Sequence, residues 1–266
     1  MSDPGRGLGL GRPTDAAETD PAAEPSAASP VDPTPGRVLP SLIEVVLCSG
    51  FPTQLVLSTL LAAIGFTVLT PSGEPAFGYI VTVTLLDVLV VVALVTTFLH
   101  ARDETVRELV LGSRPPRREA ALGVVLTPPI VVGAVAGLLL IGWLAPGLRN
   151  VPDNPFGPML ETPGRALVFA LVVVLAGGLR EEMQRAFILR RFDQHLGGGW
   201  FGLVVFSIAF GLGHAVQGWD TVIVTGALGA LWGTLYLTRG SAVAAMVSHT
   251  GFNLTQIALA VVAGQP

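Results

Sequence analysis

The sequence predicts an all-α fold, a polytopic transmembrane bundle of about seven to eight helical spans. The first observation is the composition: 51% of the 266 residues are apolar and 13% are charged, whereas a soluble domain carries about 25% charged residues. The second is a mean hydropathy of +0.66. The third is a succession of long apolar runs without the alternation of a membrane barrel, which favours helices as the spanning structure.

The apolar runs begin after residue 40 and follow one another to the C-terminus. A bilayer core of about 30 Å takes about 20 residues of helix to cross, and four of the runs meet that length easily. The run at 166–179 is too short to span unless it continues through Arg180, Glu181 and Glu182. The runs lie at 42–69, 76–99, 120–145, 166–179, 199–216, 219–238 and 241–263.

The first forty residues have a different composition. They hold eight of the 21 prolines, six of the 19 acidic residues and few large apolar side chains. Such a segment cannot bury enough apolar surface to offset the entropy of ordering it. We therefore expect a disordered tail at 1–40 and a transmembrane helical domain at 41–266.

All fifteen basic residues are arginines, and their distribution predicts the orientation. By the positive-inside rule, the arginine-rich segments at 100–119 and 183–198 face the cytoplasm, and the N-terminus lies on the same side. The absence of lysine indicates a high-GC coding style, typical of a bacterium. We expect a multi-pass protein of the bacterial inner (plasma) membrane, with membrane lipids as partners.

The charge and the cysteine count exclude several classes of protein. A net charge of −4 leaves no basic patch for nucleic acid, so no nucleic-acid partner is expected. The single cysteine, Cys48, excludes an intrachain disulfide framework and a cysteine-based zinc site.

Two glutamates and an arginine follow the fourth apolar run. Because helical residues three and four apart share a face, Arg185 can reach either Glu181 or Glu182. An arginine that binds one carboxylate would leave the other free to act as a base. The alternative is an interfacial ion pair at a helix end.

The last three runs contain two histidines and an asparagine. His249 and Asn253 are four residues apart, so both project from one helical face, where two donors suit a developing oxyanion. Phe210 and His214 have the same spacing. The alternative for each is a polar side chain that bonds a neighbouring helix. Together with a glutamate base, the set offers what amide hydrolysis needs: a base, a positioned water and oxyanion donors.

These residues resemble the three motifs of the CPBP family, the CAAX-protease and bacteriocin-processing membrane proteins, which includes the type II CAAX prenyl endopeptidases and the Abi proteins. The family pattern is a glutamate pair with a following arginine, then Phe-x-x-x-His, then His-x-x-x-Asn or Asp. The matching core would lie at about 164–263. The matching residues are Glu181-Glu182-Met-Gln-Arg185, Phe210-Gly-Leu-Gly-His214 and His249-Thr-Gly-Phe-Asn253.

The first motif departs from the family pattern at its arginine. Two residues separate Glu182 from Arg185 here, whereas the family has three, and Ala186 occupies the usual arginine position. On an ideal helix, the direction in which the arginine side chain points is thus rotated by about 100° about the helix axis. Either a local adjustment preserves the role of Arg185, or the arginine clamps a different carboxylate.

The resemblance implies an intramembrane endopeptidase that hydrolyses a peptide bond in a membrane-associated protein or peptide. In that family's pattern, Glu181 would activate the water with help from His214, and His249 and Asn253 would stabilise the oxyanion. The supporting residues would be Glu182, Arg185 and Phe210. A zinc ion bound by Glu181, His214 and His249 fits the residue types, and so does a metal-free glutamate mechanism.

Two other functions remain open. One is a catalytically inactive membrane protein on the same fold, such as an immunity or scaffold factor. The other is a small transporter in which Asp87 and the histidines relay protons. Asp87 and Glu44, both in the first two apolar runs, have no assigned role and are interpreted as helix-packing residues.

Overall fold

The computed structural model describes residues 35–151 and 155–264. Every described element belongs to one compact unit of the chain. The predicted disordered tail lies outside the described residues up to position 34. Its last positions, from Pro35, instead open the first helix.

The described residues form helices, joined by loops that contain one isolated β-bridge between Leu69 and Pro75. The prediction of an all-helical fold is confirmed. In chain order, the elements are α1 Pro35–Cys48, α2 Phe51–Ala63, α3 Phe77–His100, α4 Val106–Leu111, α5 Pro116–Leu144, η1 Pro146–Leu148, η2 Gly157–Met159, α6 Pro163–Val173, η3 Val174–Glu181, α7 Glu182–His195, α8 Gly199–Leu212, η4 Ala215–Gln217, α9 Trp219–Arg239 and α10 Val243–Val262.

Within the described residues, four helices are long and apolar enough to cross a membrane: α3, α5, α9 and α10. A fifth span is counted if α1 and α2, which meet at a 46° bend, form one broken span. These helices suggest an integral multi-pass membrane protein, but they do not show the seven to eight spans expected. The fourth run passes into the charged residues of α7, and the fifth yields an apolar helix of only 14 residues, α8.

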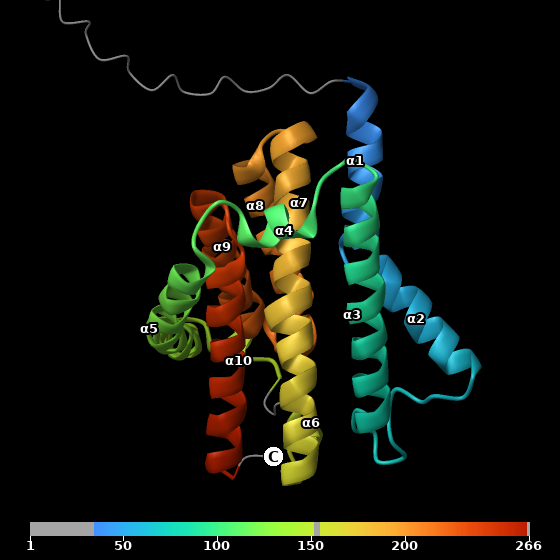
Figure 1. The fold of residues 1–266 in the computed structure, drawn as a ribbon. Coiled ribbons are helices and arrows are strands. Elements are labelled where there is room, and N and C mark those ends of the chain that lie inside the picture. Colours follow the sequence, from blue (N-terminus) through green and yellow to red (C-terminus); the bar gives the residue numbers. More distant parts are fainter. Residues whose placement is uncertain (1–34, 152–154, 265–266) are drawn as a thin grey trace, which may run out of the picture. The chain divides into compact units, whose positions relative to one another are not determined.

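Helices α6 and α7 lie in line, joined by the π-helix η3, and this column contacts both α3 and α10 (Figure 1). Two glycines of η3 allow α10 to approach. A Cβ atom at Gly178 would clash with Thr250 Oγ1, and one at Gly177 would meet Asn253 and His249. Short π-helical segments are frequent at functional sites, and this one ends at Glu181.

Small residues also set the contact between α8 and α9. A Cβ atom at Gly211 would lie 2.6 Å from the carbonyl oxygen of Val222, and one at Gly229 would lie 2.9 Å from the Phe210 ring. Helix α8 therefore packs its backbone closely against α9, which is typical of helix pairs in lipid.

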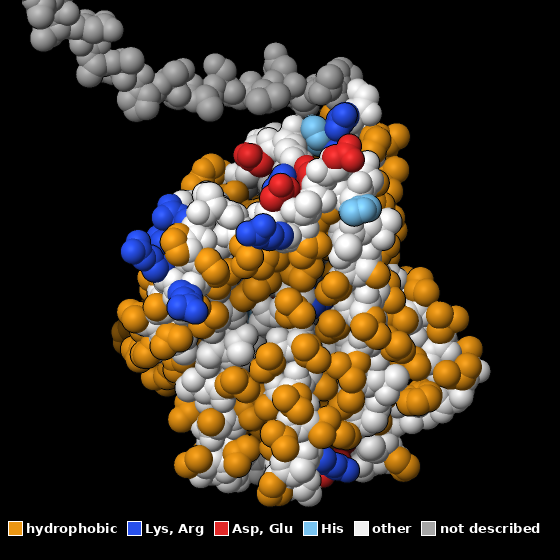
Figure 2. All heavy atoms as spheres, viewed as in Figure 1, with side chains coloured by type: hydrophobic (Ala, Val, Ile, Leu, Met, Phe, Trp, Pro, Cys, Tyr) orange, Lys and Arg blue, Asp and Glu red, His pale blue; other side chains and the backbone are white. Residues whose placement is uncertain are grey.

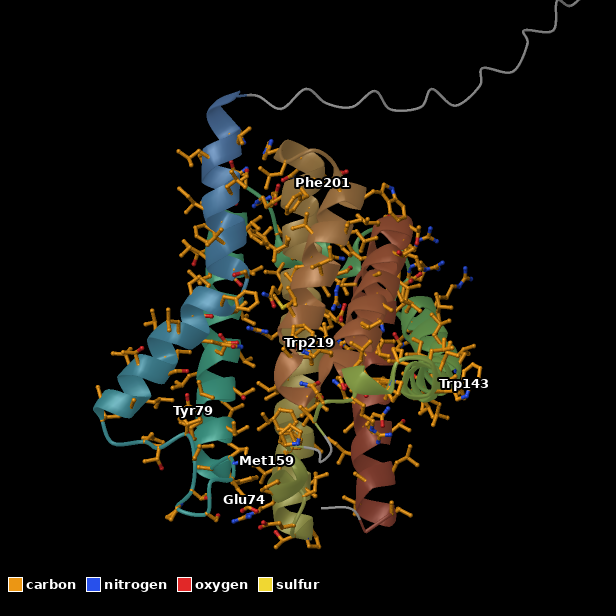
Figure 3. The ribbon with its side chains drawn as sticks, turned by 180° about the vertical axis from the view of Figure 1, so that it is seen from behind. Glu74, Tyr79, Trp143, Met159, Phe201 and Trp219 are labelled. Atoms are coloured by element: carbon orange, nitrogen blue, oxygen red, sulfur yellow. The ribbon has the colours of Figure 1, made fainter. Side chains whose placement is uncertain are left out.

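The surface divides by chemistry. Figure 2 shows most of the charged and histidine side chains over the upper part of the view, with hydrophobic side chains over much of the rest. Trp143, at the end of α5, is 78% exposed and points outward (Figure 3). Many large apolar side chains are exposed in the same way, which suits a lipid environment.

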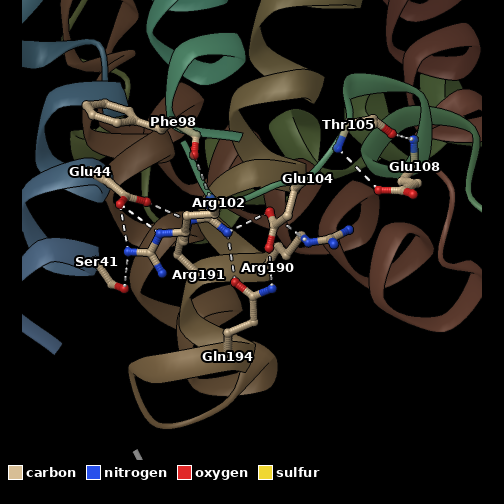
Figure 4. A network of polar contacts seen from close by, with 10 residues as sticks. All are labelled: Ser41, Glu44, Phe98, Arg102, Glu104, Thr105, Glu108, Arg190, Arg191 and Gln194. Atoms are coloured by element: carbon tan, nitrogen blue, oxygen red, sulfur yellow. Dashed lines mark hydrogen bonds and ion pairs between the residues drawn. The ribbon is translucent and has the colours of Figure 1, made fainter. Parts of the chain in front are cut away.

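An extensive ion network joins α1, the connection after α3 and the end of α7 (Figure 4). We call it the brace network, and it consists of Ser41, Glu44, Arg102, Glu104, Arg190, Arg191 and Gln194. Arg191 donates to Glu44 over 2.6 Å and to Glu104 over 2.8 Å. Arg102 donates to the other oxygen of Glu44 over 2.6 Å. Glu44, without an assigned role in the sequence, thus binds two arginines.

Candidate active site

The two predicted glutamates occupy the junction between η3 and α7, and their surroundings differ. Glu182 is buried, with its side chain 1% exposed, whereas that of Glu181 is 20% exposed. Consecutive helical residues point in different directions, about 100° apart. One carboxylate is therefore enclosed in the bundle, and the other is open to a small molecule such as water.

Glu182 binds two partners inside the bundle. Arg185 donates from Nη1 to Glu182 Oε1, and Nδ1 of His249 lies 2.7 Å from the same oxygen. The sequence left open which glutamate Arg185 binds, and the structure gives Glu182, in the i,i+3 relation. The arginine thus clamps the second glutamate of the pair despite its shifted position.

Aromatic rings enclose the Arg185 side chain, which is 0% exposed. Its guanidinium carbon lies 4.7 Å from the centre of the Phe210 ring and 5.5 Å from the centres of the Phe206 and Trp232 rings. In the described part of the chain, its Nε and Nη2 atoms have no hydrogen-bond partner. Burying donors without a partner costs free energy, and cation–π attraction to the three rings offsets part of that cost.

His249 is held between Glu182 and the indole of Trp232. The two rings are stacked with centroids 3.8 Å apart and planes 15° apart. The indole itself is fixed, because its Nε1 donates to Ser248 Oγ over 3.1 Å and Ser248 in turn donates to the Ala244 carbonyl over 2.8 Å. A hydrogen bond to the carboxylate at Nδ1 leaves Nε2 of His249 facing the other side of the ring.

Nε2 of His249 faces Glu181 and Asn253. Glu181 Oε2 lies 3.9 Å from it. A Cβ atom at Gly177 would lie 3.3 Å from His249 Nε2 and 2.5 Å from Asn253 Nδ2. Two side-chain nitrogens therefore approach the same glycine of η3, beside the partly exposed carboxylate.

His214 lies apart from this group. It follows α8, and its Nδ1 donates to the Phe210 carbonyl over 2.8 Å. Its ring packs on Phe210, whose own ring contacts His249 with centroids 6.4 Å apart. Among the described residues, His214 makes no hydrogen bond or ion pair with Glu181 or His249.

An arginine that the sequence reading did not assign to the site also reaches it. Arg180 Nη1 lies 3.9 Å from Glu181 Oε1, while its Nη2 donates to Asp87 Oδ2. Thr53 donates to the other oxygen of Asp87 over 2.6 Å. Asp87, the unexplained acidic residue of α3, thus holds the arginine next to Glu181.

Trp232 was likewise missed. Its position between Gly229 and Gly233, on a helix that packs closely, is the signal that could have found it. A large aromatic side chain within a run of small residues indicates a site where a neighbouring helix leaves space for one ring.

The predicted zinc ligands do not form a metal site in the described residues, where no group of three or more His, Cys, Asp or Glu side chains could hold a metal ion. The Nδ1 bonds of His214 and His249 are of the kind that zinc-binding histidines make. However, Glu181, His214 and His249 do not converge on one point. The residues as arranged do not fit zinc, and zinc dependence stays a prediction.

Carboxylates, an imidazole and an amide thus lie close together between apolar helices, and those helices suggest a multi-pass membrane protein with polar side chains inside its bundle. Residues 163–255 match the family model described as type II CAAX prenyl endopeptidase Rce1-like. This part of the chain is an Rce1-like domain of the CPBP family. It contains all three motifs, and its family suggests a CAAX-type intramembrane protease with a protein substrate. No curated protein and no solved structure matches the chain.

Proposed function

We propose that the protein is an intramembrane endopeptidase that hydrolyses a peptide bond of a membrane-associated protein or peptide. The observation that carries this proposal is the arrangement around His249. One ring nitrogen is bonded to the buried Glu182, and the other lies 3.9 Å from the accessible Glu181 and close to Gly177, which Asn253 also approaches.

Glu181 is the proposed base. Its side chain is partly exposed, and its two ion contacts, to Arg180 and His249, are both 3.9 Å long. Such distances leave room for a water molecule that the carboxylate orients and deprotonates. The water oxygen bonds to the peptide carbon, and the proton passes to Glu181 and then to the leaving amine as the C–N bond breaks.

His249 and Asn253 are the proposed oxyanion donors. The amide Nδ2 of Asn253 donates in any state, and Nε2 of His249 donates when the ring is doubly protonated. Fixed donors in a water-poor site stabilise developing charge more than water does. His214, whose ring packs on Phe210, is proposed to assist the water rather than to touch Glu181.

Glu182, Arg185 and Phe210 are positioning residues in this scheme. Arg185 holds the Glu182 carboxylate, and Glu182 holds the His249 ring with Nε2 toward Glu181. Phe210 lies against both Arg185 and His249. A ring fixed in this way presents its reacting nitrogen at a constant place, which is what an orienting carboxylate contributes in other hydrolases.

The test uses the full chain reconstituted in vesicles together with a bacterial membrane-protein extract, and new N-termini are mapped by mass spectrometry. Glu181→Gln should reduce cleavage by at least ~100-fold, the lower end for loss of a general base. His249→Ala should reduce it by ~100-fold or more. Glu161→Gln is the matched control, because Glu161 is exposed and pairs with Arg165.

Unchanged cleavage in Glu181→Gln and His249→Ala, with folding retained, would reject the proposal. A chelator with metal add-back then tests zinc: a metal-free preparation that stays fully active rejects a zinc mechanism. The outlying place of His214 favours one second candidate, a non-catalytic scaffold. That function predicts no new N-termini with the wild-type protein.

A further inference from the structure

A hollow of about 370 Å³ lies at the charged end of the described structure, beside the brace network. Three segments distant in sequence form its walls: the start of α1, the connection after α3 and the end of α7. Its lining side chains are Arg37, Arg102, Glu104, Asp193, Gln194 and His195.

Three of these side chains have hydrogen-bonding capacity that the described residues do not use. Arg102 donates from Nε and Nη2 to Glu44 and Ser41, but its buried Nη1 has no partner. The buried Nδ1 of His195 has none either. Arg37 is exposed and makes no hydrogen bond or ion pair within the described part of the chain. A buried donor without a partner is costly, so an acceptor is expected in the hollow.

The carboxylates nearby each have a hydrogen-bond partner within the described residues. Glu44 binds Arg102 and Arg191, and Glu104 binds Arg191 and Gln194. Asp193 accepts the backbone N–H of Gly199. The lining itself carries two guanidiniums, those of Arg37 and Arg102, and two carboxylates, those of Glu104 and Asp193. Glu104 is also bound by Arg190 and Arg191, which do not line the hollow, so its negative charge is compensated.

The pKa of His195 also reflects the charges around the hollow. Burial lowers the pKa of His195 below its usual value, and the charges of Arg102, Arg37 and Arg191 lower it further, while Glu44 acts in the opposite sense. Positive charge thus dominates at the imidazole, which is where an anion would be stabilised.

We propose that this hollow binds a phosphate group, with Arg37, Arg102 and His195 as its donors. Guanidinium groups match the geometry and charge of phosphate oxygens, and three donors from three segments suit a tetrahedral anion better than a planar carboxylate. The phosphate can belong to a lipid headgroup or be free in solution, and the two sources are separated by experiment.

The surroundings fit a lipid headgroup. Leu39 on α1 and Trp200 and Phe201 on α8 are large, exposed apolar side chains close in sequence to Arg37 and His195. Phe201 lies near the same end of the molecule as the start of α1 (Figure 3). Aromatic side chains beside arginines at the end of apolar helices are typical of the membrane–water interface.

The experiment measures thermal unfolding of the full chain in delipidated detergent micelles, titrated separately with inorganic phosphate, short-chain phosphatidylglycerol and short-chain diacylglycerol. The wild-type protein should gain thermal stability with phosphatidylglycerol or phosphate and not with diacylglycerol. The variant Arg37→Gln/His195→Gln should bind at least ~10-fold more weakly, the loss expected for about one charge-assisted hydrogen bond. Neither residue has another bond to lose in the described structure.

Arg165→Gln is the matched control, because Arg165 is an arginine at the start of α6, outside the residues that line the hollow, and should leave binding unchanged. Tighter binding of phosphatidylglycerol than of inorganic phosphate assigns the site to a lipid headgroup, and equal binding assigns it to free phosphate. Equal stabilisation by diacylglycerol, equal binding in the double variant, or no stabilisation by either phosphate compound would overturn the proposal.

Discussion

Helix α7 carries an arginine–glutamate cluster at each end, and the two clusters differ in how completely their hydrogen bonds are used. At its start, Arg185 and His249 share one oxygen of Glu182, and two guanidinium nitrogens face aromatic rings without partners. At its end, Arg191 donates to Glu44, Glu104 and Gln194 (Figure 4). We call the first group, consisting of Glu182, Arg185, His249 and Trp232, the site cluster.

The difference separates two uses of the same residue types. The brace network ties α1 and the end of α3 to α7, and each of its carboxylates has more than one partner. The loss of one bond therefore leaves others that hold the helices together. In the site cluster, few alternative partners are available, and the bonds fix the orientation of the His249 imidazole. Replacing both partners of a buried ion pair by apolar residues often changes stability little. Removing only one partner is strongly destabilising, because the other charge stays buried and unpaired.

The largest expected effect is therefore that of Arg185→Met. It leaves the Glu182 carboxylate buried without its cation and should lower the free energy of unfolding by about 3–5 kcal/mol. The measurement is unfolding by SDS in mixed micelles. The double variant Glu182→Gln/Arg185→Met removes both charges and should recover most of the loss. A single variant as stable as the wild type would refute the description of Glu182 as an enclosed charge.

A smaller effect is expected for Arg191→Met. In this variant Glu44 still binds Arg102, and Glu104 still binds Gln194 and Arg190, so each carboxylate retains a partner. We expect a loss of about 2 kcal/mol, between that of an ordinary charged hydrogen bond and that of an unpaired buried charge. The same SDS titration measures it. If Arg191→Met cost more than Arg185→Met, the comparison between the two clusters would be reversed.

The sequence singled out Glu182, Arg185 and His249 of the site cluster, but not Trp232 and not the contacts between them. Spacing along one helix could pair His249 with Asn253, but it could not show that His249 binds Glu182, 67 residues earlier. Arg185 was ambiguous because i+3 and i+4 are both neighbours on an ideal helix. The π-helix before Glu182 alters the local geometry, and nothing in the glutamate motif predicts this π-helix.

The acidic residues that the sequence left without an assigned role are paired with arginines over long distances. Asp87 and Arg180 are 93 residues apart, and Glu44 and Arg191 are 147 apart. Rarity of charge in apolar runs marked Asp87 and Glu44 as unusual, but a partner on another helix depends on packing. The seven to eight expected spans are not shown for a related reason: hydropathy does not reveal that the fourth run passes into the charged residues of α7, or that the fifth yields a helix of only 14 residues.

The smallest effect sharpens the comparison through pH, because the brace network lies at helix ends within reach of water. Burial alone would raise the pKa of Glu104, but hydrogen bonds from Gln194 and Arg191 and the charges of Arg191 and Arg190 hold it below its usual value. A carboxylate with a lowered folded-state pKa contributes stability above its unfolded pKa of about 4.3. That contribution is lost as the pH falls through the folded-state pKa.

Glu104→Gln should therefore be less stable than the wild type at pH 7, and the difference should shrink below about pH 4 as the wild-type carboxyl takes up its proton. Unfolding curves from pH 7 to pH 3 measure the difference. Glu161→Gln is the control, since an exposed pair with Arg165 contributes about 0–1 kcal/mol at any pH in this range. A difference for Glu104→Gln that stayed constant down to pH 3 would mean that its charge does not support the brace network. The residue would then act through shape and neutral hydrogen bonds, as the amide of Gln194 does.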